Sequence, residues 1–150
     1  MAIARVSVAE DKAALVRSLR SSEASTGPFK TYADVVTFAA VLGFRNSRKV
    51  PITGFSRREP DPIPQDQFRS PFIIELIAVA DVQDPNILAN NEESDRRRVE
   101  IFQQYANGGF EILQTELSGI VDYSEHILLI LSQDQQIEQI NDEFDLSQFL

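Results

Sequence analysis

The side chains of this sequence that are best suited to chemistry are basic, and most of them lie in one stretch. Lysine and arginine on loops can neutralise phosphates and release counterions, which is the main source of sequence-independent affinity for DNA. One further arginine lies near the N-terminus, so the candidate nucleic-acid contacts are Arg5, Arg45, Arg48, Lys49, Arg57 and Arg58. Two other interpretations stay open: these residues form a solvated loop, or they pair with carboxylates elsewhere in the chain.

Residues for covalent or metal chemistry are scarce. The sole histidine, His126, lies in an apolar run, where a helix-edge or hydrogen-bonded core histidine is the commoner explanation. The sequence has no cysteine, no Gly-x-Ser-x-Gly elbow and neither of the glycine-rich phosphate-binding loops. We therefore predict no catalytic residues, no metal site and no cofactor, and a protein that is not an enzyme.

A metal-dependent nuclease is the third alternative that we keep. Such an enzyme needs convergent carboxylates, commonly with a nearby lysine, to hold cations and activate water. Carboxylates are plentiful, but they are spread along helix starts and the C-terminal tail, and the lysines are Lys12, Lys30 and Lys49. This distribution is typical of solvated surfaces.

Length and composition predict one globular domain over residues 1–150. The chain is 43% hydrophobic and 25% charged, which is close to the ordinary globular mixture. The lack of cysteine favours a reducing compartment, and we expect a cytoplasmic location. The best apolar run, Phe72 to Ala80, contains Glu75 and is far too short to cross a bilayer, so we expect no contact with a membrane.

The net charge of −9 conceals a division of the chain into two parts. Residues 1–58 carry ten Lys/Arg against four Asp/Glu, a balance of +6, whereas residues 59–150 carry four against nineteen, a balance of −15. We accordingly distinguish a basic N-terminal part, 1–58, from an acidic helical part, 71–150. The two charges could form separate surfaces or neutralise each other within the fold.

The first half of the sequence predicts an extended arm and two helices. Arg5 to Val8 alternates polar and apolar residues, and a helical pattern follows from Glu10. Ser21 to Pro28 has the composition of a loop. A largely buried helix should begin after Thr31, whose hydroxyl can cap the first turn, and should stop at Gly43.

A proline-rich connection from Phe44 to Pro71 separates this half from further helices. We expect one helix from Pro71 that ends before Pro85, and a solvated helix start at Asn90 to Arg98. Gly108 and Gly109 should mark a break between two helices, a kink, or a close approach of another backbone. The fold class is mainly α: a compact helical domain with a short N-terminal strand or arm and a proline-rich central connection.

The C-terminal region predicts a last long helix and an acidic tail. Apolar residues at helical spacing run from Ile120 to Leu131. Ser132 to Leu150 interleaves acidic and apolar residues, which is typical of a segment that docks on a partner or of a last helix that packs on its own domain.

Three stretches of the chain resemble one family. They are Arg-Val-Ser-Val-Ala-Glu-Asp-Lys (Arg5 to Lys12), the run from Thr26 to Phe44, and Ile-Phe-Gln-Gln-Tyr-Ala-Asn-Gly-Gly-Phe-Glu-Ile-Leu (Ile101 to Leu113). Together they are similar to the small accessory proteins of bacterial DNA phosphorothioation (Dnd) systems, the group called DNA phosphorothioation-associated protein four. The Tyr-Ala-Asn-Gly-Gly segment is the most distinctive.

The resemblance implies a role beside enzymes that place sulfur in the DNA backbone, or beside the restriction machinery that spares DNA so marked. It supplies no catalytic residues for this chain. Our leading hypothesis is a non-catalytic accessory of such a modification and phage-defence system, which binds other Dnd proteins and contacts duplex DNA through the basic residues. The alternative is a DNA-binding transcriptional regulator that uses the basic N-terminal part. The sequence leaves open whether the chain forms a homo-oligomer.

Overall fold

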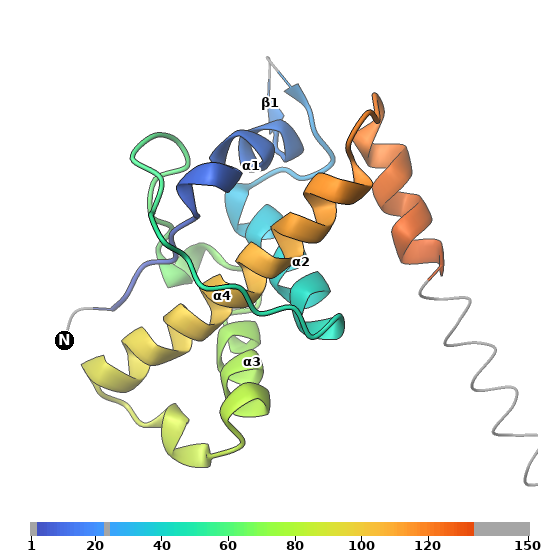
Figure 1. Ribbon diagram of the computed structural model, residues 1–150. Coiled ribbons are helices and arrows are strands. Elements are labelled where there is room, and N and C mark those ends of the chain that lie inside the picture. Colours follow the sequence, from blue (N-terminus) through green and yellow to red (C-terminus); the bar gives the residue numbers. More distant parts are fainter. Residues whose placement is uncertain (1–2, 23–24, 134–150) are drawn as a thin grey trace, which may run out of the picture. The chain divides into compact units, whose positions relative to one another are not determined.

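The computed structural model describes residues 3–22 and 25–133 (Figure 1). The chain divides into two compact units, residues 1–116 and residues 117–150, and each is described by itself. That all 150 residues form a single domain stays a prediction. The expected mainly helical fold, with an N-terminal arm and a long irregular connection, is confirmed.

Two long helices, α2 (Tyr32–Arg45) and α4 (Glu92–Glu116), pack together as the centre of the first unit (Figure 1). α2 begins where the sequence predicts, because the Asp34 amide donates a hydrogen bond of 3.1 Å to the Thr31 hydroxyl. Its apolar side chains are buried, among them Val35, Val36, Ala39 and Ala40.

The predicted stop of α2 at Gly43 is wrong, because the helix continues to Arg45. Gly43 lies at the crossing with α4, where a β-carbon would overlap the carbonyl oxygen of Tyr105. The glycine is therefore explained by packing between backbones rather than by helix termination.

The glycine pair in α4 meets α2 at this crossing and the segment that follows α2. α4 is continuous over 25 residues, so neither a break nor two separate helices is present there. A β-carbon on Gly109 would overlap the carbonyl oxygen of Ala39, and one on Gly108 would overlap that of Arg48. Of the three alternatives for these glycines, the close approach of another backbone is confirmed.

The N-terminal arm, residues 3–9, runs beside the connection that follows α2. We call residues 46–64 of that connection the strap. Val6 exchanges two backbone hydrogen bonds with Ile63, of 2.9 and 2.8 Å. The chain then enters the short helices η1 (Glu10–Lys12) and α1 (Ala13–Leu19) and the two-residue antiparallel strands β1 (Ser21–Ser22) and β2 (Ser25–Thr26), which occupy the predicted loop.

The remaining helices of the first unit follow the strap. They are η2 (Gln65–Gln67), α3 (Phe72–Val82) and η3 (Pro85–Leu88). α3 begins after Pro71 and ends before Pro85, as the sequence predicts. Ile74, Ile77 and Ala78 are its buried residues, whereas Phe72 and Leu76 are exposed.

The second unit contains a helix over residues 123–133, close to the predicted span. Its start is capped by Asp122, whose carboxylate accepts a hydrogen bond of 3.1 Å from the Glu125 amide. The rest of the acidic tail lies outside the described residues. In residues 3–22 and 25–133, no helix is both long enough and apolar enough to cross a membrane.

Candidate functional site

Arg48 is a predicted DNA contact that the fold pairs with a carboxylate. It follows α2 and reaches Glu111 on α4, with Nη2 at 2.9 Å and Nε at 3.1 Å from the same carboxylate oxygen. Both side chains remain partly exposed. The backbone of Arg48 is fixed by its amide, which donates to the Gly43 carbonyl at 2.8 Å.

Lys49 is the second paired residue, and it belongs to a more buried cluster. Its Nζ lies 2.8 Å from Asp81 Oδ2 on α3, while the Tyr105 hydroxyl of α4 donates to Asp81 Oδ1 at 2.6 Å. These two bonds connect the strap, α3 and α4. Lys49 thus pairs with a carboxylate of the acidic part, which is one of the two alternatives that the sequence left open for the basic residues.

The electrostatics of this cluster favour a fixed charge state. Burial raises the pKa of Asp81. The hydrogen bonds from Lys49 and Tyr105 together outweigh this effect, so the net shift of the pKa is downward. Burial, with the hydrogen bond to Asp81 and its charge, raises the pKa of Tyr105 to about 12. Near neutral pH the cluster therefore holds an ionised Asp81 and a neutral Tyr105.

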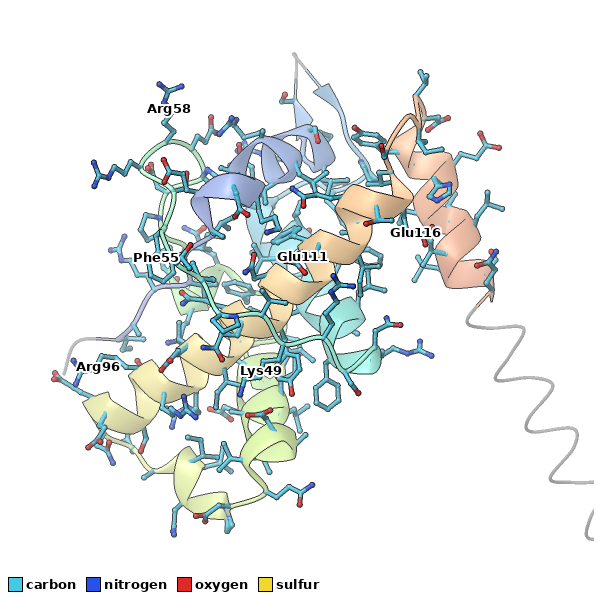
Figure 2. The ribbon with its side chains drawn as sticks, viewed as in Figure 1. Lys49, Phe55, Arg58, Arg96, Glu111 and Glu116 are labelled. Atoms are coloured by element: carbon cyan, nitrogen blue, oxygen red, sulfur yellow. The ribbon has the colours of Figure 1, made fainter. Side chains whose placement is uncertain are left out.

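The other four predicted contacts lie on the surface. Arg45 is exposed at the end of α2. Arg5 on the arm and Arg57 and Arg58 on the strap are exposed too, and no ion pair of their side chains occurs within the described ranges. Arg58 projects from the loop of the strap (Figure 2). The six predicted DNA contacts therefore do not form one cluster in the fold.

A groove of about 590 Å³ lies between the arm and the strap, over one face of α4. Ala4, Arg5 and Ser7 form the wall on the arm side, and Pro51, Ile52 and Phe55 form the wall on the strap side. The floor is a row of α4 side chains: Arg96, Val99, Glu100, Gln103 and Gln104. Figure 2 shows Phe55 and Arg96 on this flank of the first unit.

Polar groups in the groove are only partly used by the fold. The Ser7 amide donates to Gln103 Oε1 at 2.7 Å, and Glu100 lies 3.4 Å from Arg97. Arg96 is exposed, and none of its side-chain atoms forms an ion pair with any residue that the structure describes. The groove therefore offers two unpaired guanidinium groups, from Arg5 and Arg96.

Asp95 holds the arm against α4 at the end of this groove. Its carboxylate accepts hydrogen bonds from the Ala4 amide at 2.6 Å and from Gln65 Nε2 at 3.0 Å, and it lies 3.5 Å from Arg98. Only 8% of the Asp95 side chain is exposed. The interpretation of residues 90–98 as a solvated helix start is therefore wrong for Asp95, because the arm covers it.

Sequence reasoning singled out Arg5 but missed the other residues that make the groove. Phe55 is 48% exposed, and Arg96 comes from a helix start that we interpreted as ordinary surface. The one available signal was an aromatic residue within a polar, glycine-containing loop. His126 lies half-buried in the helix of the second unit. Across residues 3–22 and 25–133, no group of three potential ligands among His, Asp and Glu could hold a metal ion.

The fold and the groove define a mainly helical protein in which an N-terminal arm and a strap border an open groove on a long helix. Residues 5–149 match the family model described as DNA sulphur modification system-associated protein 4. The match covers nearly the whole chain, so the protein belongs to this family, and the resemblance seen in the sequence is confirmed. The protein is thus associated with the DNA sulphur modification (Dnd) system. Neither a curated protein nor a solved structure matches the chain.

Proposed function

We propose that this protein is a non-catalytic accessory component of the DNA sulphur modification system and that it binds another protein of that system. The observation that carries the proposal is the groove, where Arg5 and Arg96 form no ion pair with any described residue and the Phe55 side chain is 48% exposed. Exposed aromatic and arginine side chains are the residues that contribute most to protein interfaces. The proposal places the protein in the cytoplasm, with the DNA.

The ionisable cluster around Asp81 supports a structural role rather than a catalytic one. A general acid or base works best when its pKa lies near the operating pH. In this cluster the pKa of Asp81 is lowered and that of Tyr105 is raised, so both move away from neutrality. The hydrogen bonds of Asp81 instead connect three elements of the fold, which is a structural role.

DNA binding is the second candidate, in the form of an accessory that also contacts DNA or of a transcriptional regulator. The observation that favours it is the exposure of Arg5, Arg57 and Arg58 without ion pairs in the described part of the chain. Arg48 and Lys49 contribute less, since each already pairs with a carboxylate. Any DNA contact should therefore depend on the arm and the strap loop.

Co-purification tests the proposed function. The tagged full-length protein is expressed together with the other proteins of the sulphur modification system, and the extract is treated with nuclease before purification. We expect at least one of those proteins to remain bound in stoichiometric amount, because the contact is between proteins. Loss of every partner on nuclease treatment, with retention in the untreated extract, would instead establish DNA as the shared ligand.

A further inference from the structure

On one edge of the arm beside the groove, most backbone groups form no hydrogen bond with any residue that the structure describes. We propose that the groove binds an extended, acidic peptide segment of a partner protein, which pairs as an added strand with Arg5 to Ser7. This inference rests on the proposed function and specifies its recognition mode. Its elements are the arm, the strap side chains and the floor of α4 (Figure 2).

The hydrogen bonds of the arm show which edge is free. Val6, Val8 and Glu10 all direct backbone groups to the strap, bonding to Ile63, Ser56 and Gly54 at 2.8 to 2.9 Å. In an extended chain, the backbone groups of successive residues point to opposite edges. The groups of Arg5 and Ser7 therefore point away from these strap partners, and both residues line the groove.

Three of the four groups on that edge have no partner. The Ser7 amide is bonded to Gln103, but the amide and carbonyl of Arg5 and the carbonyl of Ser7 form no hydrogen bond with any described residue. One peptide residue placed opposite Arg5 could exchange two hydrogen bonds with it. This is the pattern by which extended peptides add to exposed strands in many recognition domains.

The side chains around the groove indicate the chemistry of the peptide. Phe55, Ile52 and Val99 offer an apolar contact, while Arg5 and Arg96 offer two unpaired positive charges. A short extended peptide that carries both apolar and acidic residues would match the apolar contact and the positive charges. Arginine and carboxylate groups form strong paired hydrogen bonds.

The dimensions of the groove suit a short segment. Its floor extends along α4 from Arg96 to Gln104, which corresponds to about 12 Å of helix. At roughly 3.3 Å per residue, this accommodates about four residues of an extended strand. Duplex DNA fits less well, because Glu100 would face its phosphates and the free backbone groups of Arg5 would lack a complement.

A selection experiment tests the peptide chemistry. A random library of nine-residue peptides is displayed and selected against the folded, full-length protein. We expect enrichment of peptides with an acidic residue next to an apolar one, and their affinity should fall about tenfold or more in Arg96→Glu and Phe55→Ala. Arg58→Glu and Phe72→Ala are matched controls outside the groove, and they should keep the affinity once circular dichroism shows all variants folded.

N-methylation of the selected peptide tests strand pairing itself. Methylation of one amide at a time removes single backbone donors, so a paired strand should lose affinity at alternate positions. Uniform tolerance of N-methylation would overturn the added strand. Equal affinity of wild type and both groove variants, or the absence of any enriched peptide, would overturn the site.

Other occupants of the groove give distinct results. Self-association in light scattering that is lost in Arg96→Glu would assign the groove to a second copy of this chain, and a duplex DNA shift lost in the same variant would assign it to nucleic acid. Either result overturns the proposal that the groove binds a peptide of a partner protein. If Arg96→Glu still retains the partner in co-purification, the groove inference fails while the accessory function stands; if wild type retains none, the function itself fails.

Discussion

Single side chains decide how the basic residues of this protein act. Lys49 is tied to Asp81, and Asp81 is also the acceptor of the Tyr105 hydroxyl. Arg57 and Arg58, by contrast, reach solvent. Basic residues that lie close together in sequence therefore have different roles: Lys49 acts within the fold, whereas Arg57 and Arg58 lie at its surface.

The Tyr105 hydroxyl predicts a specific dependence of stability on alkaline pH. Its pKa is raised from 10.0 to about 12 in the folded protein. A group with a raised folded pKa stabilises the fold fully below its unfolded pKa, and this contribution is lost as the pH rises through the folded pKa. Between pH 10 and 12, the unfolding free energy of wild type should therefore fall by about 2 to 3 kcal/mol more than that of Tyr105→Phe.

Urea unfolding at several pH values measures this difference. The comparison between the two proteins removes the contribution of lysines, which titrate in both. Parallel decreases in wild type and Tyr105→Phe would show that the hydroxyl is not held in its neutral form by the fold.

Asp95 carries a second prediction, which concerns the arm. Replacing it by alanine removes the acceptor of the Ala4 amide and of Gln65 Nε2, and should destabilise the protein by about 2 kcal/mol. The arm should also open more often, so trypsin should cut faster after Arg5. Asp66→Ala, an exposed carboxylate on η2, is the control and should leave both stability and cleavage unchanged. Unchanged cleavage in Asp95→Ala would contradict the role of Asp95 in holding the arm.

At the scale of elements, the crossing of α2 and α4 depends on glycine on both helices. Gly43, Gly108 and Gly109 each place a backbone hydrogen where a methyl group would overlap a carbonyl oxygen of another segment. The close approach brings the strap over α4, and the Val50 amide then bonds to the Gln104 carbonyl at 3.0 Å. The position of the groove thus follows from the packing of these two helices.

Gly109→Ala tests the close approach. Alanine favours helix over glycine by up to about 1 kcal/mol, so a simple helical glycine would be stabilised by this change. Here the methyl group meets the Ala39 backbone, and we expect a net destabilisation of at least about 2 kcal/mol in chemical unfolding. Gly54→Ala, where the nearest atom lies 3.7 Å away, should change stability little. A Gly109→Ala protein as stable as wild type would contradict the packing described.

Local signals in the sequence predicted the elements well but not their contacts. The hydroxyl of Thr31 and the prolines at 71 and 85 act on their own neighbours, so the helix starts and the end of α3 could be predicted. Gly43 resembled a helix stop because its partner, Tyr105, is distant in sequence. The groove escaped prediction for the same reason, since Arg5, Phe55 and Arg96 are brought together only by the fold.

At the scale of the whole molecule, the division of charge is partly cancelled within the fold. Arg48 and Lys49 of the basic N-terminal part pair with Glu111 and Asp81 of the acidic part. Arg5 on the arm and Arg57 and Arg58 on the strap form no ion pair with any residue that the structure describes. Any interaction of the protein with polyanions should depend on these free cations.

This distribution predicts which variants alter contact with DNA. If the protein shifts duplex DNA at low salt, Arg57→Glu combined with Arg58→Glu should weaken the shift about tenfold or more, because two phosphate contacts are lost. Arg48→Ala should change it much less, since Arg48 is already paired with Glu111. The reverse order, measured by gel shift at several salt concentrations, would show that the Arg48 pair opens to bind DNA.

The central claim is that the protein binds a protein partner of the sulphur modification system through the groove. The most direct measurement is co-purification from nuclease-treated extract, comparing wild type with the double variant Phe55→Ala and Arg96→Glu and with the double control Phe72→Ala and Arg58→Glu. The account predicts that wild type and control retain the partner and that the groove variant loses it. Equal retention by all three folded proteins would contradict the claim.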